Sequence, residues 1–399
     1  MKIVHISYSD NGGAGIAALR LHNALLLNGI NSKFICLIKT TNNREVYQFC
    51  PKPISRIRRS AILWGFLKTI DHKNQIRLSQ ISNDYEMFSF PTTKFNLFDN
   101  IFVRDADIIH LHWVSNFLNW KSFFKHCKKQ IVWTLHDFNP FSGGFHYPAD
   151  KSKASVELNY LDCSLEDLKY NSIINFKKIE IVCLSNWLMN YSKSSRILGK
   201  YPHSIIRNSV PISIFRSYSK NSIRKLLGIS LSQKVVLFVS ETLQNKRKGF
   251  DLLLPIINDK EFSDYLFIAV GYVSEKLQEL NNKNLKLLGL INDEIMLAWI
   301  YNCSDVYVTP SIEDNLPNSV IEALCCGVPV AGFNVAGIKE MIQNGVNGFL
   351  AERLTSTSLS DTINKCMVTT FIDIEKNAQK LYSSELQASK YSDLYIKCC

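Results

Sequence analysis

The chain has 399 residues, of which 46% are hydrophobic and 20% are charged. This composition is typical of a folded globular protein, and we find no solenoid repeat or low-complexity tract. The length predicts two domains of about 200 residues each. The formal net charge of +11 favours a polyanionic partner, and nucleic acid, an anionic membrane surface and a phosphorylated ligand all satisfy that condition.

The eleven cysteines are scattered along the chain without a CxxC pair. Their spacing and odd number indicate reduced thiols and argue against a disulfide scaffold or a zinc site. The N-terminus enters a strand directly, without the features of a signal peptide. No apolar run approaches the roughly 18 residues of a membrane span. We therefore expect a cytoplasmic protein that is at most peripheral on the inner face of a membrane.

The first half of the chain alternates strands and helices. Residues 2–8 form an apolar strand, NGGAG at 11–15 breaks it, and a helical pattern leads to a second strand at 31–39. Such a β-α-β unit is typical of parallel strands. Further strands are predicted at 107–113, 130–135 and 180–185. We interpret residues 1–212 as a doubly wound α/β domain.

Periodicity lapses at 207–220, and the alternation then begins again. Strands are predicted at 234–240, 265–271, 285–290, 305–311 and 328–333. They define a second Rossmann-like domain, 213–378, and a helix at 379–399 is expected to pack back on the first domain. The predicted fold class is α/β, with two doubly wound parallel sheets whose carboxyl strand ends face a cleft between the domains.

Residues 52–77 combine seven Lys or Arg residues with large apolar side chains such as Trp64 and Phe66. A basic amphipathic helix of this kind can lie in an anionic headgroup layer. An ordinary surface helix that packs its apolar side on the domain explains the same pattern equally well.

Two acids follow the predicted strand at 305–311, in SIEDNLPNSVIEALCCG. Asp314 lies in a loop, and Glu322 lies in the second turn of a helix that Asn318 or Ser319 can cap. A carboxylate can hold two vicinal hydroxyls, such as those of ribose or a hexose. A glutamate favoured by the helix macrodipole and a turn-forming aspartate explain the spacing as well, so spacing alone leaves both interpretations open.

Three cations follow the strand at 234–240, in KRKG at 246–249. Lys246, Arg247 and Lys248 could meet negative charge that develops on a leaving diphosphate. A run of three cations is otherwise typical of a solvated surface.

The NGGAG segment offers small residues, including Gly13 and Gly15, at a helix start where a ligand could approach backbone N–H groups. Its spacing differs from the GxGxxG of dinucleotide-binding folds, and the second strand ends without an acid. An NAD enzyme is therefore disfavoured. Gly337, after the last predicted strand, is a second helix start that could face a ligand or merely open the helix.

His136 directly follows the strand at 130–135, and Asp137 beside it could orient or charge-stabilise it. His110 and His112 share one face of their strand, and we interpret them as packed, hydrogen-bonded histidines. The DxD spelling at 105–107 precedes its strand and so lies at the wrong edge of the sheet for a metal site.

The string PSIEDNLPNSVIEALCCGVPVAGFNVAGIKEMIQNGVNGFL resembles the paired-acid region of glycosyltransferase family 4. NGGAGIAALRLHNAL, TLHDFNPFSGGFHYP, RNSVPISIF and KRKGFDLLL are similar to that family in the expected order, and together they span nearly the whole chain. The resemblance implies a GT-B fold with the active site between two Rossmann-like domains. It also implies that neither a metal nor another cofactor is needed.

The resemblance assigns roles to several residues. Glu322 would hold the ribose, Asp314 the donor sugar and Lys248 the diphosphate, and His136 would contact the sugar. The further donor-binding positions are Gly13, Gly15, Arg247, Asn315, Leu316 and Gly337. Many relatives have Glu where Asp314 stands, which makes Glu313 a spare candidate. An upstream arginine of the family is missing here, and Arg247 or Lys246 would have to replace it.

The leading hypothesis is a retaining glycosyltransferase that moves a hexose-type sugar from a UDP- or GDP-sugar to a growing glycan. The acceptor would be a glycan or lipid-linked glycan of O-antigen, capsule or exopolysaccharide, and residues 52–77 could rest on an anionic membrane. A nucleotide-sugar epimerase or hydrolase on the same fold is the alternative. A nucleic-acid-binding protein is disfavoured, because the chain lacks a known nucleic-acid motif.

Overall fold

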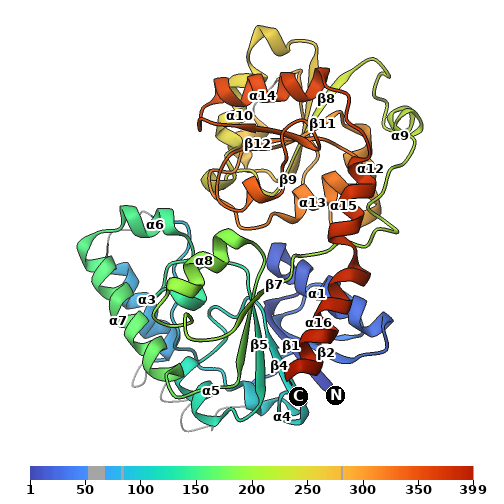
Figure 1. Ribbon diagram of the computed structural model, residues 1–399. Coiled ribbons are helices and arrows are strands. Elements are labelled where there is room, and N and C mark those ends of the chain that lie inside the picture. The colour runs from blue at the N-terminus through green and yellow to red at the C-terminus, as the bar shows by residue number, and fades with distance from the viewer. Residues whose placement is uncertain (53–67, 82–84, 280–281, 399) are drawn as a thin grey trace. The chain divides into compact units, whose positions relative to one another are not determined.

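The computed structural model describes residues 1–52, 68–81, 85–279 and 282–398. The chain folds into two compact units (Figure 1). Unit 1 comprises Met1–Ile206 and Lys390–Cys399, and unit 2 comprises Arg207–Ser389. Each unit is an α/β fold built on one sheet, so the predicted fold class of two Rossmann-like units is confirmed.

The sheet of unit 1 has seven parallel strands in the order β3-β2-β1-β4-β5-β6-β7. Its strands are β1 (Lys2–Ser9), β2 (Asn31–Ile38), β3 (Val46–Gln48), β4 (Ile108–Leu111), β5 (Gln130–Leu135), β6 (Ile179–Cys183) and β7 (His203–Ile205). Every residue of β4 is buried, as expected for a parallel strand covered on both faces. The strand order reverses between β1 and β4, which makes their carboxyl ends the switch point of this sheet.

Helices cover both faces of the unit 1 sheet (Figure 1). They are α1 (Gly12–Leu27), α3 (Ile70–Ser79), α4 (Ile101–Asp105), α5 (Trp120–His126), α6 (Pro148–Lys153), α7 (Val156–Ile173) and α8 (Asn186–Ser194). Trp133 of β5 packs against Trp120 of α5, with ring centroids 5.1 Å apart. The next residue, Thr134, points to the opposite face because side chains alternate along a strand, and the C-terminal helix covers it there.

The sheet of unit 2 has six parallel strands in the order β10-β9-β8-β11-β12-β13. They are β8 (Lys234–Thr242), β9 (Tyr265–Tyr272), β10 (Leu285–Leu287), β11 (Val306–Thr309), β12 (Val330–Phe333) and β13 (Gly348–Ala351). Its helices are α9 (Lys220–Leu226), α10 (Phe250–Ile257), α11 (Glu275–Gln278), α12 (Glu294–Cys303), α13 (Asn318–Cys325), α14 (Ser356–Val368) and α15 (Ile374–Tyr382). The switch point of this sheet lies between β8 and β11.

The boundary between the units lies at Arg207 and not at residue 212 as predicted, because residues 207–210 bond to residues 383–387 of unit 2. Val210 forms a bridge with Ser383, and Gln387 bonds to Ser209 and to the carbonyl of Arg207. The last helix, α16 (Ser384–Cys398), therefore starts in unit 2, and its residues from Lys390 onward belong to unit 1.

Three short strands were not predicted from the sequence. β3, β7 and β13 have three or four residues each, too few to show an alternating pattern. The strands that were predicted are present, with ends that differ by up to three residues.

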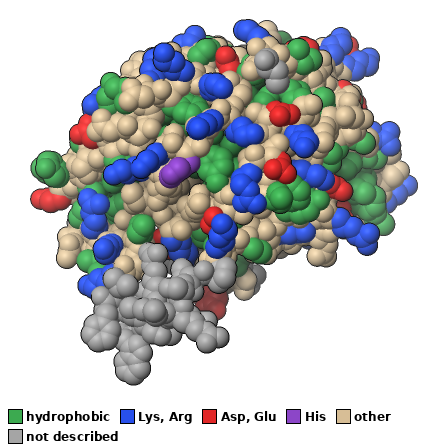
Figure 2. Space-filling view, turned by 90° about the horizontal axis from the view of Figure 1, so that it is seen from below, with side chains coloured by type: hydrophobic (Ala, Val, Ile, Leu, Met, Phe, Trp, Pro, Cys, Tyr) green, Lys and Arg blue, Asp and Glu red, His purple; other side chains and the backbone are tan. Residues whose placement is uncertain are grey.

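Of the basic segment 52–77, residues 53–67 lie outside the described residues. Within the described part, α3 has no buried residue, and no helix there combines the length and apolar character that a membrane crossing requires. On the face shown in Figure 2, Lys and Arg side chains are spread among hydrophobic and polar ones, with acidic side chains between them.

Candidate functional site

The carboxyl edge of the unit 2 sheet carries the charged side chains expected from the sequence. Lys248 lies in the 3-10 turn Lys246–Lys248 after β8, and Asp314 lies in the loop after β11. These loops flank the switch point, where open α/β sheets bind ligands. The two side chains meet there, with Lys248 Nζ 2.5 Å from Asp314 Oδ2.

Arg247 joins this ion pair. Its Nη1 lies 3.7 Å from Asp314 Oδ2 and donates a 2.9 Å hydrogen bond to the carbonyl of Glu313. Lys246 is exposed, so Arg247 is the neighbour of Lys248 that stands at the expected site. Burial by itself raises the pKa of Asp314, but Lys248 and Arg247 more than offset it and bring the pKa below its ordinary value of 3.8.

Gly249 lets the loops after β8 and β11 approach each other. Its φ of +73° lies in the left-handed region, and a Cβ there would lie 2.0 Å from the carbonyl oxygen of Pro310. On the other side of the turn, Asn245 Oδ1 accepts hydrogen bonds from the N–H groups of Arg247 and Lys248. The backbone thus fixes the two cations in place.

Glu322 lies in α13 and is only 6% exposed. Its Oε2 accepts a 2.9 Å hydrogen bond from the hydroxyl of Tyr301, a fully buried residue of α12. Burial, and then the Glu322 carboxylate, raise the pKa of Tyr301, so this hydroxyl stays protonated and donates. The helix begins at Asn318 with Pro317 in the N-cap position, and the side-chain cap that the sequence suggested is absent there.

Asn315 and Leu316, between the two acids, are buried beneath the site. Gly337 packs against them, because a Cβ there would lie 1.6 Å from the carbonyl oxygen of Asn315. Its N–H donates to the carbonyl of Asp314 at 2.9 Å. Gly337 stands at the N-cap position of a three-residue 3-10 helix, Ile338–Glu340, so the helix that starts at this glycine is a 3-10 turn. This glycine joins two loops of the site.

The glycine loop after β1 opens α1 at the carboxyl edge of unit 1. A Cβ on Gly15 would lie 2.5 Å from the carbonyl oxygen of Ser9, so this glycine allows α1 to pack close to the strand. By contrast, among the described residues outside its own helical turn, no heavy atom lies within 4 Å of the place that a Cβ on Gly13 would take. This space at the first turn of a 16-residue helix is compatible with the ligand approach predicted there.

His136 follows β5 at the same edge and is half-buried. Its Nε2 lies 3.4 Å from Nδ1 of His112, and Nε2 of His112 lies 2.9 Å from Nδ1 of His5. Burial lowers the pKa of His136 to about 4, although Asp137 opposes the shift. The imidazole of His136 is therefore neutral at physiological pH.

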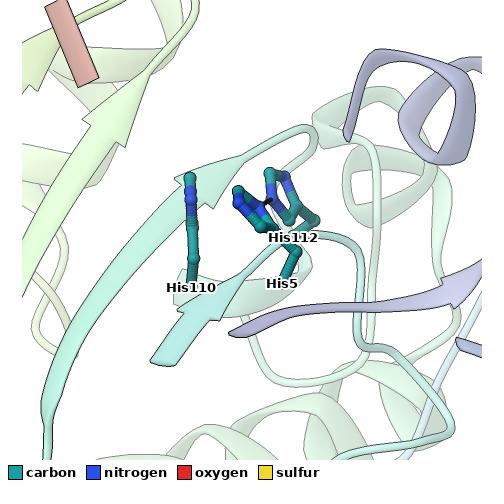
Figure 3. A group of neighbouring side chains, drawn as sticks. All are labelled: His5, His110 and His112. Carbon is teal, nitrogen blue, oxygen red and sulfur yellow. Dashed lines mark hydrogen bonds between the residues drawn. The ribbon is translucent and has the colours of Figure 1, made fainter. Parts of the chain in front are cut away.

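His110 is a buried, hydrogen-bonded histidine, as we expected from its strand. Its Nδ1 contacts the hydroxyl of Tyr395 at 2.7 Å and its Nε2 contacts Thr134 at 2.8 Å. Ring nitrogens of His5, His110 and His112 lie within 4.8 Å of one another (Figure 3), which is a spacing a metal ion could use. Because both nitrogens of His110 already contact hydroxyls, we interpret the group as a hydrogen-bonded cluster.

The predicted DxD acids lie at the opposite, amino edge of the sheet. Asp105 ends α4 and Asp107 directly precedes β4. The carboxylate of Asp107 accepts a 2.7 Å hydrogen bond from the backbone N–H of Lys2.

Asp137 fastens the loop that follows β5. Its Oδ2 lies 2.6 Å from both His146 Nδ1 and Trp113 Nε1, and Nε2 of His146 lies 2.8 Å from the hydroxyl of Ser89. The chain of contacts Ser89–His146–Asp137 resembles a Ser-His-Asp catalytic triad. Because Ser89 is 1% exposed and His146 is fully buried, no substrate reaches the hydroxyl of Ser89. Asp137 thus has a structural role in addition to its charge, which favours protonated His136 as the sequence suggested.

Sequence reasoning missed Tyr301 and His5. Tyr301 stands in an apolar stretch of α12, and His5 in an apolar strand, so neither carries a local signal. Their contacts join residues 21 and 107 positions apart, respectively.

Comparison with known proteins gives the class of this fold. The fold is shared with Anabaena HepE in complex with UDP-glucose, with a TM-score of 0.66 and 16% identity, covering 100% of both chains. An uncharacterized protein of the cps region of Klebsiella pneumoniae is 22% identical, over 100% of this chain and 99% of that protein. The Escherichia coli UDP-Gal:alpha-D-GlcNAc-diphosphoundecaprenol alpha-1,3-galactosyltransferase is 27% identical, but the alignment covers only 56% of either protein.

Each unit has the Rossmann-like sheet of the GT-B fold, which the chain shares with WaaG, a glycosyltransferase involved in lipopolysaccharide biosynthesis, at a TM-score of 0.60 and 15% identity over 97% of this chain and 95% of that chain. Residues 233–368 match the family described as "Glycosyl transferases group 1", and this segment contains the ion pair, Glu322 and Tyr301. The chain is therefore a glycosyltransferase, and its similarity to group 1 enzymes lies in residues 233–368 of unit 2.

Proposed function

We propose that this glycosyltransferase belongs to family 4 and transfers a hexose-type sugar, with retention, from a UDP-sugar to a lipid-linked or growing cell-surface glycan. The observation that carries the proposal is the Lys248–Asp314 ion pair with Arg247 beside it, at the switch point of unit 2. Relatives support the choice of donor and acceptor: HepE binds UDP-glucose, and the Escherichia coli enzyme is named for UDP-Gal and a diphosphoundecaprenol acceptor. The cps-region relative supports a capsule-type glycan.

In this proposal the cations bind the diphosphate. A diphosphate that reaches the switch point competes with Asp314 for Lys248, and Arg247 supplies a second positive charge. Asp314 then accepts hydrogen bonds from hydroxyls of the donor sugar. As the acceptor oxygen bonds to the anomeric carbon, the bond to the diphosphate breaks, and the acceptor proton passes to the departing diphosphate oxygen. Both cations stabilise the charge that develops there.

Glu322 binds the ribose in this proposal. The hydroxyl of Tyr301 donates to Oε2 and thereby orients the carboxylate of Glu322. No step requires a metal ion, since Lys248 and Arg247 supply positive charge at the diphosphate.

Acceptor-dependent release of nucleoside diphosphate tests the proposal. Purified protein is first screened for thermal stabilisation by UDP, GDP and their sugars, because a ligand that binds only the folded form raises its stability. The stabilising sugar nucleotide is then incubated with and without lipid-linked acceptors. We expect UDP to stabilise, and UDP to be released only with an acceptor. Release that is indifferent to every acceptor would establish the hydrolase alternative, and wild-type turnover by Glu322→Ala would refute the ribose site.

A further inference from the structure

Three imidazoles lie in a row at the carboxyl edge of unit 1. His5 stands in β1, His112 follows β4 and His136 follows β5, so three neighbouring strands of the sheet contribute one ring each. His5 Nδ1 lies 2.9 Å from His112 Nε2, and His112 Nδ1 lies 3.4 Å from His136 Nε2. Figure 3 shows the first of these contacts. Each contact needs one hydrogen, supplied by one of its two rings.

The far end of the row decides which ring supplies each hydrogen. Nε2 of His5 is buried without a hydrogen-bond partner among the described residues. A proton there would leave an orphaned N–H, which folded proteins avoid more strictly than an unused acceptor. His5 therefore carries its proton on Nδ1 and donates to His112 Nε2.

The remaining protons follow from this choice, because a neutral imidazole has one N–H. His112 accepts at Nε2, so its proton is on Nδ1 and points to His136 Nε2. His136 accepts at Nε2, so its own proton must be on Nδ1. Burial lowers the pKa of His5 and His112 well below 6.5, which keeps both rings neutral.

We propose that His5 and His112 are positioning residues that fix His136 as the Nδ1–H tautomer, so that it offers a hydrogen-bond donor to a ligand oxygen. The lone pair of Nε2 is occupied by His112, and His136 therefore does not act as a general base through that nitrogen. The ligand part of this inference rests on the proposed function, in which His136 contacts a hydroxyl of the donor sugar. The tautomer itself is a property of the protein alone.

Nitrogen NMR of protein labelled with ¹⁵N-histidine tests the tautomer directly. Long-range ¹H–¹⁵N spectra at pH 7.5 distinguish a protonated ring nitrogen from a bare one, and a His136→Gln sample assigns the signal. We expect His136 and His112 to show protonated Nδ1 and bare Nε2. A protonated Nε2 on His136 would overturn the proposal, whatever the enzyme's activity.

Two substitutions of His112 separate tautomer control from packing. In His112→Asn the side-chain amide keeps an N–H donor near the place of Nδ1, whereas His112→Leu removes it. We expect the asparagine variant to keep His136 protonated on Nδ1 and the leucine variant to show a mixture of tautomers, with kcat/KM reduced about tenfold. His22→Asn is the matched control, because His22 is equally buried but bonds to Ser32 outside the row. Its His136 signals should match those of the wild type.

A metal ion at His5, His110 and His112 would also change these spectra. Addition of Zn²⁺ to protein treated with a chelator should leave the three rings unchanged, because His112 Nε2 already accepts from His5. Joint shifts of the three rings would overturn the hydrogen-bonded row. If the spectra are as expected but no sugar nucleotide binds, the proposed function fails and the tautomer assignment stands.

Discussion

The carboxyl edges of the two sheets differ in the charge of the side chains they carry. The unit 1 edge bears neutral imidazoles, since burial holds the pKa of His112 and His136 below 6.5. The unit 2 edge bears Lys248, Arg247 and Asp314, whose charges sit within an ion-pair cluster. An ionic edge suits a charged diphosphate, and a neutral edge suits hydroxyl groups. In the proposed function, the same strand topology would thus support two kinds of recognition, set by a few residues at the strand ends.

The two edges are also supported differently. Below the unit 1 edge, histidines and tyrosines bond to one another inside the sheet, as His110 does to Tyr395. In unit 2 the backbone carries the support, because Gly249 and Gly337 bring three loops into contact. The support in unit 1 depends on the protonation state of the histidines. The support in unit 2 depends on glycine, because a side chain at either position would separate the loops.

The largest expected effect is that unit 1 unfolds in mild acid. The folded-state pKa of His5, His110, His112 and His136 lies below 6.5, so stability is fully present above that pH and is lost as the pH falls through it. Below pH 6.5, each ring lowers the free energy of unfolding by about 1.4 kcal/mol per pH unit, until the pH reaches the folded-state pKa of that ring. We expect hydrogen exchange, followed by mass spectrometry, to show β1, β4 and β5 opening between pH 6.5 and 4.

Unit 2 is the internal control for this experiment. In unit 2, ion pairs lower the pKa of Asp314, described above, and of Asp305, which pairs with Lys220 and Arg224, below 3.8, so the stabilisation from both carboxylates is lost only at lower pH. Opening of β8 and β11 in step with β1 would contradict the distinction between the edges.

Removal of the lysine at the ionic edge should have the next largest effect. Lys248→Ala deletes the group proposed to meet the leaving diphosphate, and loss of such a donor typically lowers kcat by about 10²- to 10³-fold. Lys246→Ala is the matched control, since Lys246 is an exposed lysine of the same turn. Steady-state kinetics with the sugar nucleotide identified by thermal shift measures both. Equal losses in the two variants would mean that net charge, and not position, is what matters.

A feature of this structure can be predicted from the sequence when the residues that form it are close together in the chain. The domain class, the main strands and the loops that carry Lys248 and Asp314 follow from local patterns, because strand ends and turn residues are adjacent in the chain. The His5–His112 contact depends on register between β1 and β4, which no local pattern specifies. Gly337 shows the same limit in another form: the sequence marks a glycine, but only the fold reveals that its N–H is bonded to Asp314.

A smaller effect is expected where a glycine holds the ionic edge together. Gly249→Ala places a Cβ 2.0 Å from the carbonyl oxygen of Pro310 in a backbone with φ of +73°, and strain and overlap together cost about 3 kcal/mol. Gly228→Ala is the control, because φ there is +66° but the space is open, which leaves only about 1 kcal/mol of backbone strain. Thermal unfolding measures both variants. Equal shifts in Tm would show that the contact with Pro310 is not what requires glycine.

The smallest predicted effect concerns the hydroxyl behind Glu322. Tyr301→Phe removes the bond to Oε2 while keeping the ring in the core, and we expect affinity for UDP to fall by about 1.5 kcal/mol, or roughly tenfold in Kd. If Tyr301 acts by orienting Glu322 toward the ribose, calorimetric titration should show a greater loss for UDP than for 2′-deoxy-UDP. Tyr307→Phe is the matched control, since this buried ring lies 5.7 Å from Tyr301 and its hydroxyl lies 3.5 Å from the carbonyl of Val239. An equal loss for both nucleotides would reduce Tyr301 to a packing residue, because only a contact made through the ribose hydroxyls distinguishes the two ligands.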